Sequence, residues 1–181
     1  MTKTTTAAKR GTGTRKASLT VLALLFAMLP ASPADTVRHA PPFTFASAGG
    51  MKTSASLRGN AVLLLVARTA KSKVLIKQLK NLKPVFHDLS SRGTIFVTAI
   101  VEGDAAVPSD IPFALASNAP AVAAAYGLRG EFLIAVIGRD GNVDVQTEKP
   151  LPGLRILEVI KNNFDVQEKS RRELPKGPPA Q

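Results

Sequence analysis

The chain has 181 residues, with 24 lysines and arginines against 13 aspartates and glutamates, and it contains no cysteine. Its length suits one folded domain with one core. The absence of a thiol excludes disulfide exchange, thiol peroxidase and glutathione chemistry carried out by residues of this chain, because each of these reactions needs a thiolate.

The amino terminus has the order of a secretory signal. Basic residues precede the first acidic residue, Asp35, and an uncharged apolar run follows at residues 19–29. Small residues at Ser32 and Ala34 then precede the expected cleavage after Ala34. The apolar run is shorter than the roughly 20 residues that span a bilayer. We therefore expect residues 1–34 to be a signal peptide that exports the protein to the periplasm or the extracellular space. A membrane anchor retained through the apolar run and an organelle transit peptide are the alternatives.

Composition divides the remaining chain into three parts. Residues 35–56 are rich in Ala, Pro, Gly, Ser and Thr without a sustained period, which predicts a flexible linker. Residues 57–168 carry the periodic apolar pattern of a folded domain. Residues 169–181 are charged and then proline-rich, which predicts a disordered tail. Without the leader the charge falls to 19 basic against 13 acidic residues, a formal +6.

The first half of the domain predicts a β-α-β unit. Residues 61–67 and 95–101 are continuous apolar runs, as in strands buried on both faces. Between them lies an amphipathic helix that Ser72 is placed to cap and that Pro84 should kink or divide. Its apolar face is formed by Leu75, Leu79, Leu82, Phe86 and Leu89.

A short helix and a third buried strand come next. Residues 118–126 predict the helix, with Asn118 as its cap and Gly127 as its stop. Residues 132–137 are again continuously apolar and predict a buried strand.

The end of the domain predicts a hairpin and a last helix. Asp140 and Gly141 supply the positive φ that a tight turn needs, and residues 143–146 alternate as a hairpin partner. Residues 154–164 show helical spacing. The predicted order is β-α-β-α-β-β-α, an α/β fold with a mixed four-stranded sheet flanked by helices.

This order and several local phrases resemble a thioredoxin-like fold. Residues 57–60 (LRGN), 126–128 (YGL) and 137–141 (IGRDG) are similar to phrases of thioredoxin and peroxiredoxin relatives. The IGRDG turn and the helix with a charged end at residues 160–173 resemble the DUF4174 family of small exported thioredoxin-like proteins. The resemblance covers roughly residues 57–173 and implies a fold more than an activity.

The chain departs from that family pattern at the redox site. If Ala70 and Lys73 occupy the two cysteine positions after the first strand, neither residue forms a thiolate. The third strand is normally preceded by a proline that faces the thiols, but residues 129–132 (RGEF) contain none. We therefore expect no catalytic residue of the redox kind.

Other chemistries find little support in the sequence. The histidines are His39, in the expected linker, and His87, near the end of the kinked helix, so a structural zinc site is not expected. Glu102 and Asp104 fit a solvated loop better than a metal site. The chain has no Gly-x-Ser-x-Gly elbow and no P-loop. We expect no metal and no cofactor.

Positive charge gathers where the first strand meets the first helix. The candidate residues for docking an anion or a partner are Arg68, Lys71, Ser72 and Lys73. A helix N-terminus attracts anions, and this edge is the usual active surface of the fold it resembles. The alternative is that these lysines only solvate the outer face of an amphipathic helix, which Lys77 and Lys80 fit well.

Three functions remain open. The first is a redox-inactive binding or accessory module of the cell envelope with an unknown protein partner. The second is electrostatic association with anionic lipid or another polyanion, with nucleic acid the weakest candidate because Tyr126 is the only Tyr or Trp. The third is an enzyme with an unrecognised cysteine-independent site. We expect the mature protein not to span a membrane.

Overall fold

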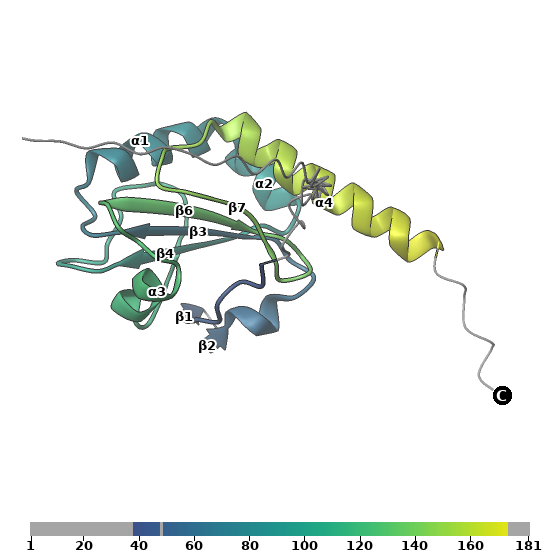
Figure 1. Cartoon of the computed structure of the whole chain (residues 1–181). Helices are drawn as coiled ribbons and strands as arrows, with labels where there is room; N and C mark the ends of the chain where they lie inside the picture. The colour runs from purple at the N-terminus through teal and green to yellow at the C-terminus, as the bar shows by residue number, and fades with distance from the viewer. Residues whose placement is uncertain (1–37, 48, 174–181) are drawn as a thin grey trace, which may run out of the picture. The chain divides into compact units, whose positions relative to one another are not determined.

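The structure is a computed structural model that describes residues 38–47 and 49–173 (Figure 1). These described residues belong to one compact unit. The expected signal peptide and residues 174–181 of the expected tail lie outside them.

The centre of this unit is a five-stranded sheet in the order β5-β4-β3-β6-β7. Its strands are β3 (Val62–Ala67), β4 (Ile95–Ile100), β5 (Ala114–Leu115), β6 (Phe132–Ile137) and β7 (Val143–Thr147). β3 is parallel to β4, and β4 to β5, whereas β6 is antiparallel to both β3 and β7. The predicted mixed α/β sheet is confirmed, with five strands instead of four. Strand β5 has two residues, too few to leave a periodic pattern in the sequence.

The three central strands are buried on both faces, as their continuous apolar runs predict. Every residue of β3 and β6 is buried, and in β4 only Ile95 is partly exposed. Leu64, at the middle of β3, lies in register with Val97 on one side and Ala135 on the other. Strands of this kind hold the sheet together through apolar burial, at roughly 0.8 kcal/mol for each buried methylene group.

One face of the sheet is covered by α1 (Lys73–Leu82), α2 (Phe86–Ser91) and α4 (Gly153–Glu173) (Figure 1). Pro84 lies in the 3₁₀ turn η2 (Lys83–Val85), so the predicted helix is divided at its proline. Helix α4 continues to Glu173, which corrects the expectation that residues 169–173 belong to a loose tail. The core on this face includes Leu75, Leu79, Leu82, Leu89, Ile156 and Ile160.

The beginning of α4 is fixed against α1 by buried polar contacts. Gln78 is fully buried, and its amide donates to the Leu151 carbonyl (3.2 Å) and accepts from the Leu151 N–H (2.7 Å). Asn81 donates a second hydrogen bond to the same carbonyl (2.9 Å). At Gly153 the two helices approach so closely that a Cβ would collide with the Asn81 carbonyl. Glycine is therefore required here for space.

The opposite face is covered by α3 (Ala119–Ala125) and by the segment that precedes β3 (Figure 1). This segment forms the antiparallel strands β1 (Thr44–Ser47) and β2 (Gly50–Thr53), followed by the 3₁₀ turn η1 (Ser54–Leu57). Strand β1 also makes an isolated bridge to the central sheet beyond β5, between Phe45 and Ala116. Phe45 of β1 is therefore packed against the sheet, whereas every residue of β2 is exposed.

Aromatic side chains explain why the flexible linker expected at residues 35–56 is wrong for the described residues. Phe43 and Phe45 are only 6% and 2% exposed and join the core on this face. The Phe43 ring lies edge-on to the ring of Tyr126, with centroids 6.2 Å apart. Buried aromatic rings contribute several kcal/mol each. The burial of two such rings therefore stabilises a packed segment in spite of the turn-forming composition around them.

The Asn118 cap, the Gly127 stop and the turn at Asp140 and Gly141 are confirmed. The Asn118 side chain accepts a hydrogen bond from the Ala121 N–H (3.1 Å) at the start of α3, and Gly127 ends that helix with φ +69°. In the hairpin between β6 and β7, the Asp140 side chain accepts from the Asn142 N–H (3.0 Å) and Gly141 has φ +83°. These local signals are read correctly because they act within a few residues.

Candidate functional site

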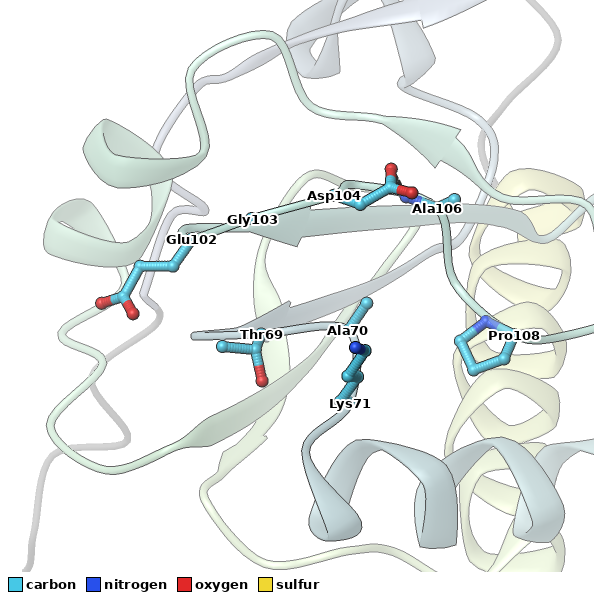
Figure 2. Close-up of a pocket in the computed structure, with 8 residues that line it drawn as sticks. All are labelled: Thr69, Ala70, Lys71, Glu102, Gly103, Asp104, Ala106 and Pro108. Carbon is cyan, nitrogen blue, oxygen red and sulfur yellow. Dashed lines mark hydrogen bonds between the residues drawn. The ribbon is translucent and has the colours of Figure 1, made fainter.

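A cavity of about 410 Å³ lies at the carboxyl-terminal ends of β3 and β4 (Figure 2). Loop 69–71, between β3 and α1, forms one side, and loop 102–108, after β4, forms the other. Its lining residues are Thr69, Ala70, Lys71, Glu102, Gly103, Asp104, Ala106 and Pro108. In open α/β sheets this edge is where ligands bind, because the loops that follow parallel strands converge there.

Arg68, one of the predicted docking residues, joins three loops instead of lining this cavity. Its Nε donates to the Gly130 carbonyl (3.0 Å), and its guanidinium lies 3.7 Å from the Glu102 carboxylate. The ion pair is exposed, at 49% for Arg68 and 61% for Glu102, so its contribution to stability is at most about 1 kcal/mol. Arg68 therefore holds loops together and has much of its charge already partnered.

Ser72 lies directly before α1, as predicted, but its hydroxyl does not cap the helix. The hydroxyl instead donates a long hydrogen bond (3.5 Å) to the Glu131 carboxylate, in the segment before β6. Ser72 is only 8% exposed. It is therefore a residue that connects the two segments, and it offers little surface to a ligand.

Lys71 and Lys73 are both exposed, but only Lys71 lines the cavity. Lys73 is the first residue of α1. Among the predicted docking residues, the structure thus places Lys71 in the wall of the cavity and the other three around it. Whether any of them binds a ligand stays a prediction.

The charge at this edge is balanced, which composition alone did not indicate. The charged residues around it are Arg68, Lys71, Lys73, Glu102, Asp104 and Glu131. Three are basic and three are acidic. The acidic side chains come from loops distant in the sequence from the basic cluster, so only the folded chain brings the two signs together. A simple anion is attracted by one set and repelled by the other.

The expected cysteine positions hold residues without a nucleophile. Ala70 is partly buried against the core and lines the cavity, and Lys73 begins α1. Across from them, the Glu148 carboxylate accepts hydrogen bonds from the N–H groups of Arg129 (2.9 Å) and Gly130 (3.3 Å). The loop before β6 is therefore fixed by Arg68 and Glu148, and the edge has a formed cavity without a thiol.

The histidines lie in different elements. His87 is an exposed residue of α2 whose ring lies 5.4 Å from that of Phe86, and His39 pairs through its backbone with Asn142. Within residues 38–47 and 49–173, no three His, Cys, Asp or Glu side chains gather closely enough to hold a metal ion. In the same ranges, no helix combines the length and the apolar character needed to cross a membrane.

Solved structures similar to this one are thioredoxin-like proteins. The mitochondrial 2-Cys peroxiredoxin of Plasmodium falciparum matches with a TM-score of 0.59 and 14% identity, over 74% of this chain and 96% of that one. A thiol:disulfide interchange protein of the thioredoxin family from Chlorobium tepidum matches with a TM-score of 0.55 and 18% identity, over 71% and 97%. The exposed lipoprotein thioredoxin of Streptococcus pneumoniae matches with a TM-score of 0.51 and 14% identity, over 67% and 99%.

Comparison by sequence gives no match to such proteins. No protein-family model matches the chain. No curated protein matches it either. At identities of 14–18% the structural likeness establishes the fold alone. The chain therefore has a thioredoxin-like α/β fold and lacks the cysteines of the redox-active proteins that share it.

Proposed function

We propose that this protein is a redox-inactive, thioredoxin-like binding module of the cell envelope that docks a protein partner at the cavity between loops 69–71 and 102–108. The observation that carries the proposal is a formed cavity at the ligand-binding edge of the sheet in a chain without cysteine. Export and membership of the DUF4174 family belong to the same proposal. The order of the leader supports export, and the IGRDG turn supports the family.

The cavity suits side chains of a protein partner. Its volume of about 410 Å³ lies in the range of small-molecule and side-chain pockets. Ala70, Gly103 and Ala106 line it with little side-chain bulk, so a partner can approach the backbone. Charged residues at the rim of the cavity and small residues inside it are typical of a protein–protein interface, which has a polar rim.

A polyanion is a weaker fit to the same edge. A lipid headgroup surface or another polyanion favours a surface of one sign, whereas acidic and basic residues are equally represented here. The exposed Lys77 and Lys80 on α1 extend positive charge away from the edge. Binding to a polyanion therefore predicts a diffuse contact that fades as salt rises.

The test compares Lys71→Glu with Lys77→Glu. Both lysines are exposed, and Lys77 lies six residues after Lys71, but only Lys71 lines the cavity. Tagged protein is used to capture partners from its own envelope fraction at low and high salt, with quantitative mass spectrometry. We expect a partner that survives high salt, is retained by Lys77→Glu and is reduced about tenfold by Lys71→Glu, since one repulsive contact is on the order of 1.4 kcal/mol. Equal loss in both variants, or loss of all binding at high salt, contradicts the proposal.

A further inference from the structure

We infer that the partner presents an extended segment of alternating acidic and basic side chains, which binds in a groove along α1. This inference rests on the proposed function and deepens it. The groove, called the α1 groove below, runs between residues 69–83 on one side and residues 102–111 on the other.

The α1 groove consists of two adjoining hollows. The first is the cavity of about 410 Å³ at the ends of β3 and β4. The second, of about 220 Å³, is lined by Ile76, Leu79, Lys80, Lys83, Pro108, Ser109, Asp110 and Ile111. Pro108 lines both hollows, so they meet at this residue. Figure 2 shows Pro108 at the opposite end of the first hollow from Glu102. There it joins residues of α1 in the lining of the second hollow.

The two walls carry opposite charge. The charged residues of the helix wall are Lys71, Lys80 and Lys83, and those of the loop wall are Glu102, Asp104 and Asp110. Every charged residue of one wall is thus basic and every charged residue of the other is acidic. Charges of opposite sign are therefore separated across the width of the groove.

One end of the groove is already closed by its own charges. Lys83 Nζ lies 2.8 Å from Asp110 Oδ2, and this hydrogen-bonded pair raises the pKa of Lys83 and lowers the pKa of Asp110. Within the described residues, Lys71 and Lys80 form no ion pair. The groove therefore leaves these two cations for a bound segment.

The loop wall is shaped in advance. Asp104 Oδ1 accepts from the Ala106 N–H (2.9 Å), which fixes a local turn of the loop. Ser109 Oγ accepts from the Ile111 N–H (3.1 Å) in a second local turn. Glu102 has Arg68 as an exposed neighbour, at 3.7 Å. A preformed wall lowers the ordering cost of binding.

An extended segment matches this separation of charge because its successive side chains point to opposite sides. Acidic side chains then reach the helix wall, and the basic side chains between them reach the loop wall. From Lys71 to Lys83 the helix wall rises about 15–18 Å, which an extended chain covers with about five residues. A helical ligand, about 10 Å across, places every third or fourth side chain on one side and does not match the walls in this way.

The first experiment titrates the full chain with four capped hexapeptides at low salt, where contacts between exposed charges are least screened, and follows its backbone amide resonances by NMR. The peptides are alternating (Glu-Lys)₃, the block Glu₃-Lys₃ of the same composition, Glu₆ and Lys₆. We expect the alternating peptide to bind at least fivefold more tightly than the block peptide, with shifts in residues 69–80 and 102–111. Equal affinity for those two peptides, tightest binding of Glu₆, or shifts confined to other regions overturns the inference.

The second experiment reverses the charge of the helix wall. Lys71→Glu with Lys80→Glu replaces both unpaired cations of the helix wall with acids and leaves only Lys83, which is paired with Asp110, so we expect the preference to change from the alternating peptide to Lys₆. The matched control is Lys52→Glu with Lys77→Glu, two exposed lysines that line neither hollow, and it should keep the original preference. An unchanged preference in the groove variant contradicts the inference.

The two proposals fail in different ways. A salt-resistant partner that is lost with Lys71→Glu but does not compete with the alternating peptide supports the binding module and overturns the extended segment. Absence of any salt-resistant partner overturns the binding module. Competition between the alternating peptide and the captured partner supports both.

Discussion

The two faces of the central sheet are closed in different ways. On one face, helices α1, α2 and α4 cover the strands with regularly spaced leucines and isoleucines. The other face is covered by the seven-residue helix α3 and by an irregular segment that is anchored by Phe43 and Phe45. Both faces are buried to a similar degree, yet only the first leaves a period in the sequence.

This difference teaches where a sequence pattern carries information. A helix repeats its inward side every three or four residues, so its core face is visible as a period. An irregular segment is held by single anchors whose partners are distant, and Tyr126 lies 83 residues after Phe43. Turn-forming composition around such anchors then predicts a linker where the chain is packed.

The largest expected effect tests whether the irregular segment is part of the core. Phe45→Ala should lower the free energy of unfolding by about 3–4 kcal/mol, because it removes a buried ring and leaves a cavity. Urea denaturation followed by circular dichroism measures the change, with exposed Thr44→Ala as the matched control. A loss as small as that of the control would contradict the packing of this segment in the core.

The next effect concerns the helical face. Gly153→Ala should cost about 2 kcal/mol, because the added Cβ collides with the Asn81 carbonyl and lies 2.8 Å from Val85 Cγ2. Leu154→Ala, at a neighbouring position that is 69% exposed, is the control and should cost much less. Equal stability of Gly153→Ala and wild type in the same denaturation experiment would show that α1 and α4 do not approach this closely.

A smaller effect uses Tyr126 as a reporter of the irregular face. Burial raises the pKa of its phenol above the ordinary value of about 10, although Arg38 acts in the opposite direction. The Tyr126 hydroxyl donates to the Pro41 carbonyl (3.0 Å), so Tyr126→Phe should cost about 1 kcal/mol.

The pH dependence follows from the raised pKa. Above about pH 10 the unfolded chain has lost the Tyr126 proton while the native chain keeps it, so stability falls as pH rises. Because Tyr126 is the only tyrosine and the chain has no tryptophan, ultraviolet titration follows this single group. We expect tyrosinate to appear together with loss of circular dichroism. Ionisation near pH 10 in a chain that remains folded would contradict burial by the segment.

The smallest expected effect is a gain on the helical face. Thr98 is 1% exposed, and its hydroxyl has no hydrogen-bond partner within the described residues. It alternates along β4 with Val97 and Ala99, which face the other core, so it lies among apolar side chains on the helical face. Thr98→Val should raise stability by up to about 1 kcal/mol. A destabilised Thr98→Val variant in thermal unfolding would mean that the hydroxyl is bonded.

The sequence predicts the helices and strands of the fold better than the contacts between them. Strand β6 and the division of the helix at Pro84 are predicted at the right residues, because apolar runs and proline act locally. Strand β5 is missed because it has two residues and exists only through its pairing with β4. The extension of α4 to Glu173 is implied only by the family resemblance and not by periodicity, because the charged end of the helix lacks an apolar period.

The candidate site is predicted in part. The basic side is visible as a cluster, and Lys71 does line the cavity. The acidic side is not predicted, because Glu102 and Asp104 are brought opposite Lys71 only by the parallel pairing of β3 and β4. The role of Arg68 in joining loops depends on Gly130, 62 residues away. No local signal in the sequence indicates that contact.

The most direct test of the binding module is a hydrogen-exchange footprint on the full chain, alone and with its captured partner. We predict added protection in loops 69–71 and 102–108 and none on β7, which lies at the other edge of the sheet. The pattern should be the same at low and high salt. Protection confined to the exposed lysines of α1 and lost at high salt would contradict the account.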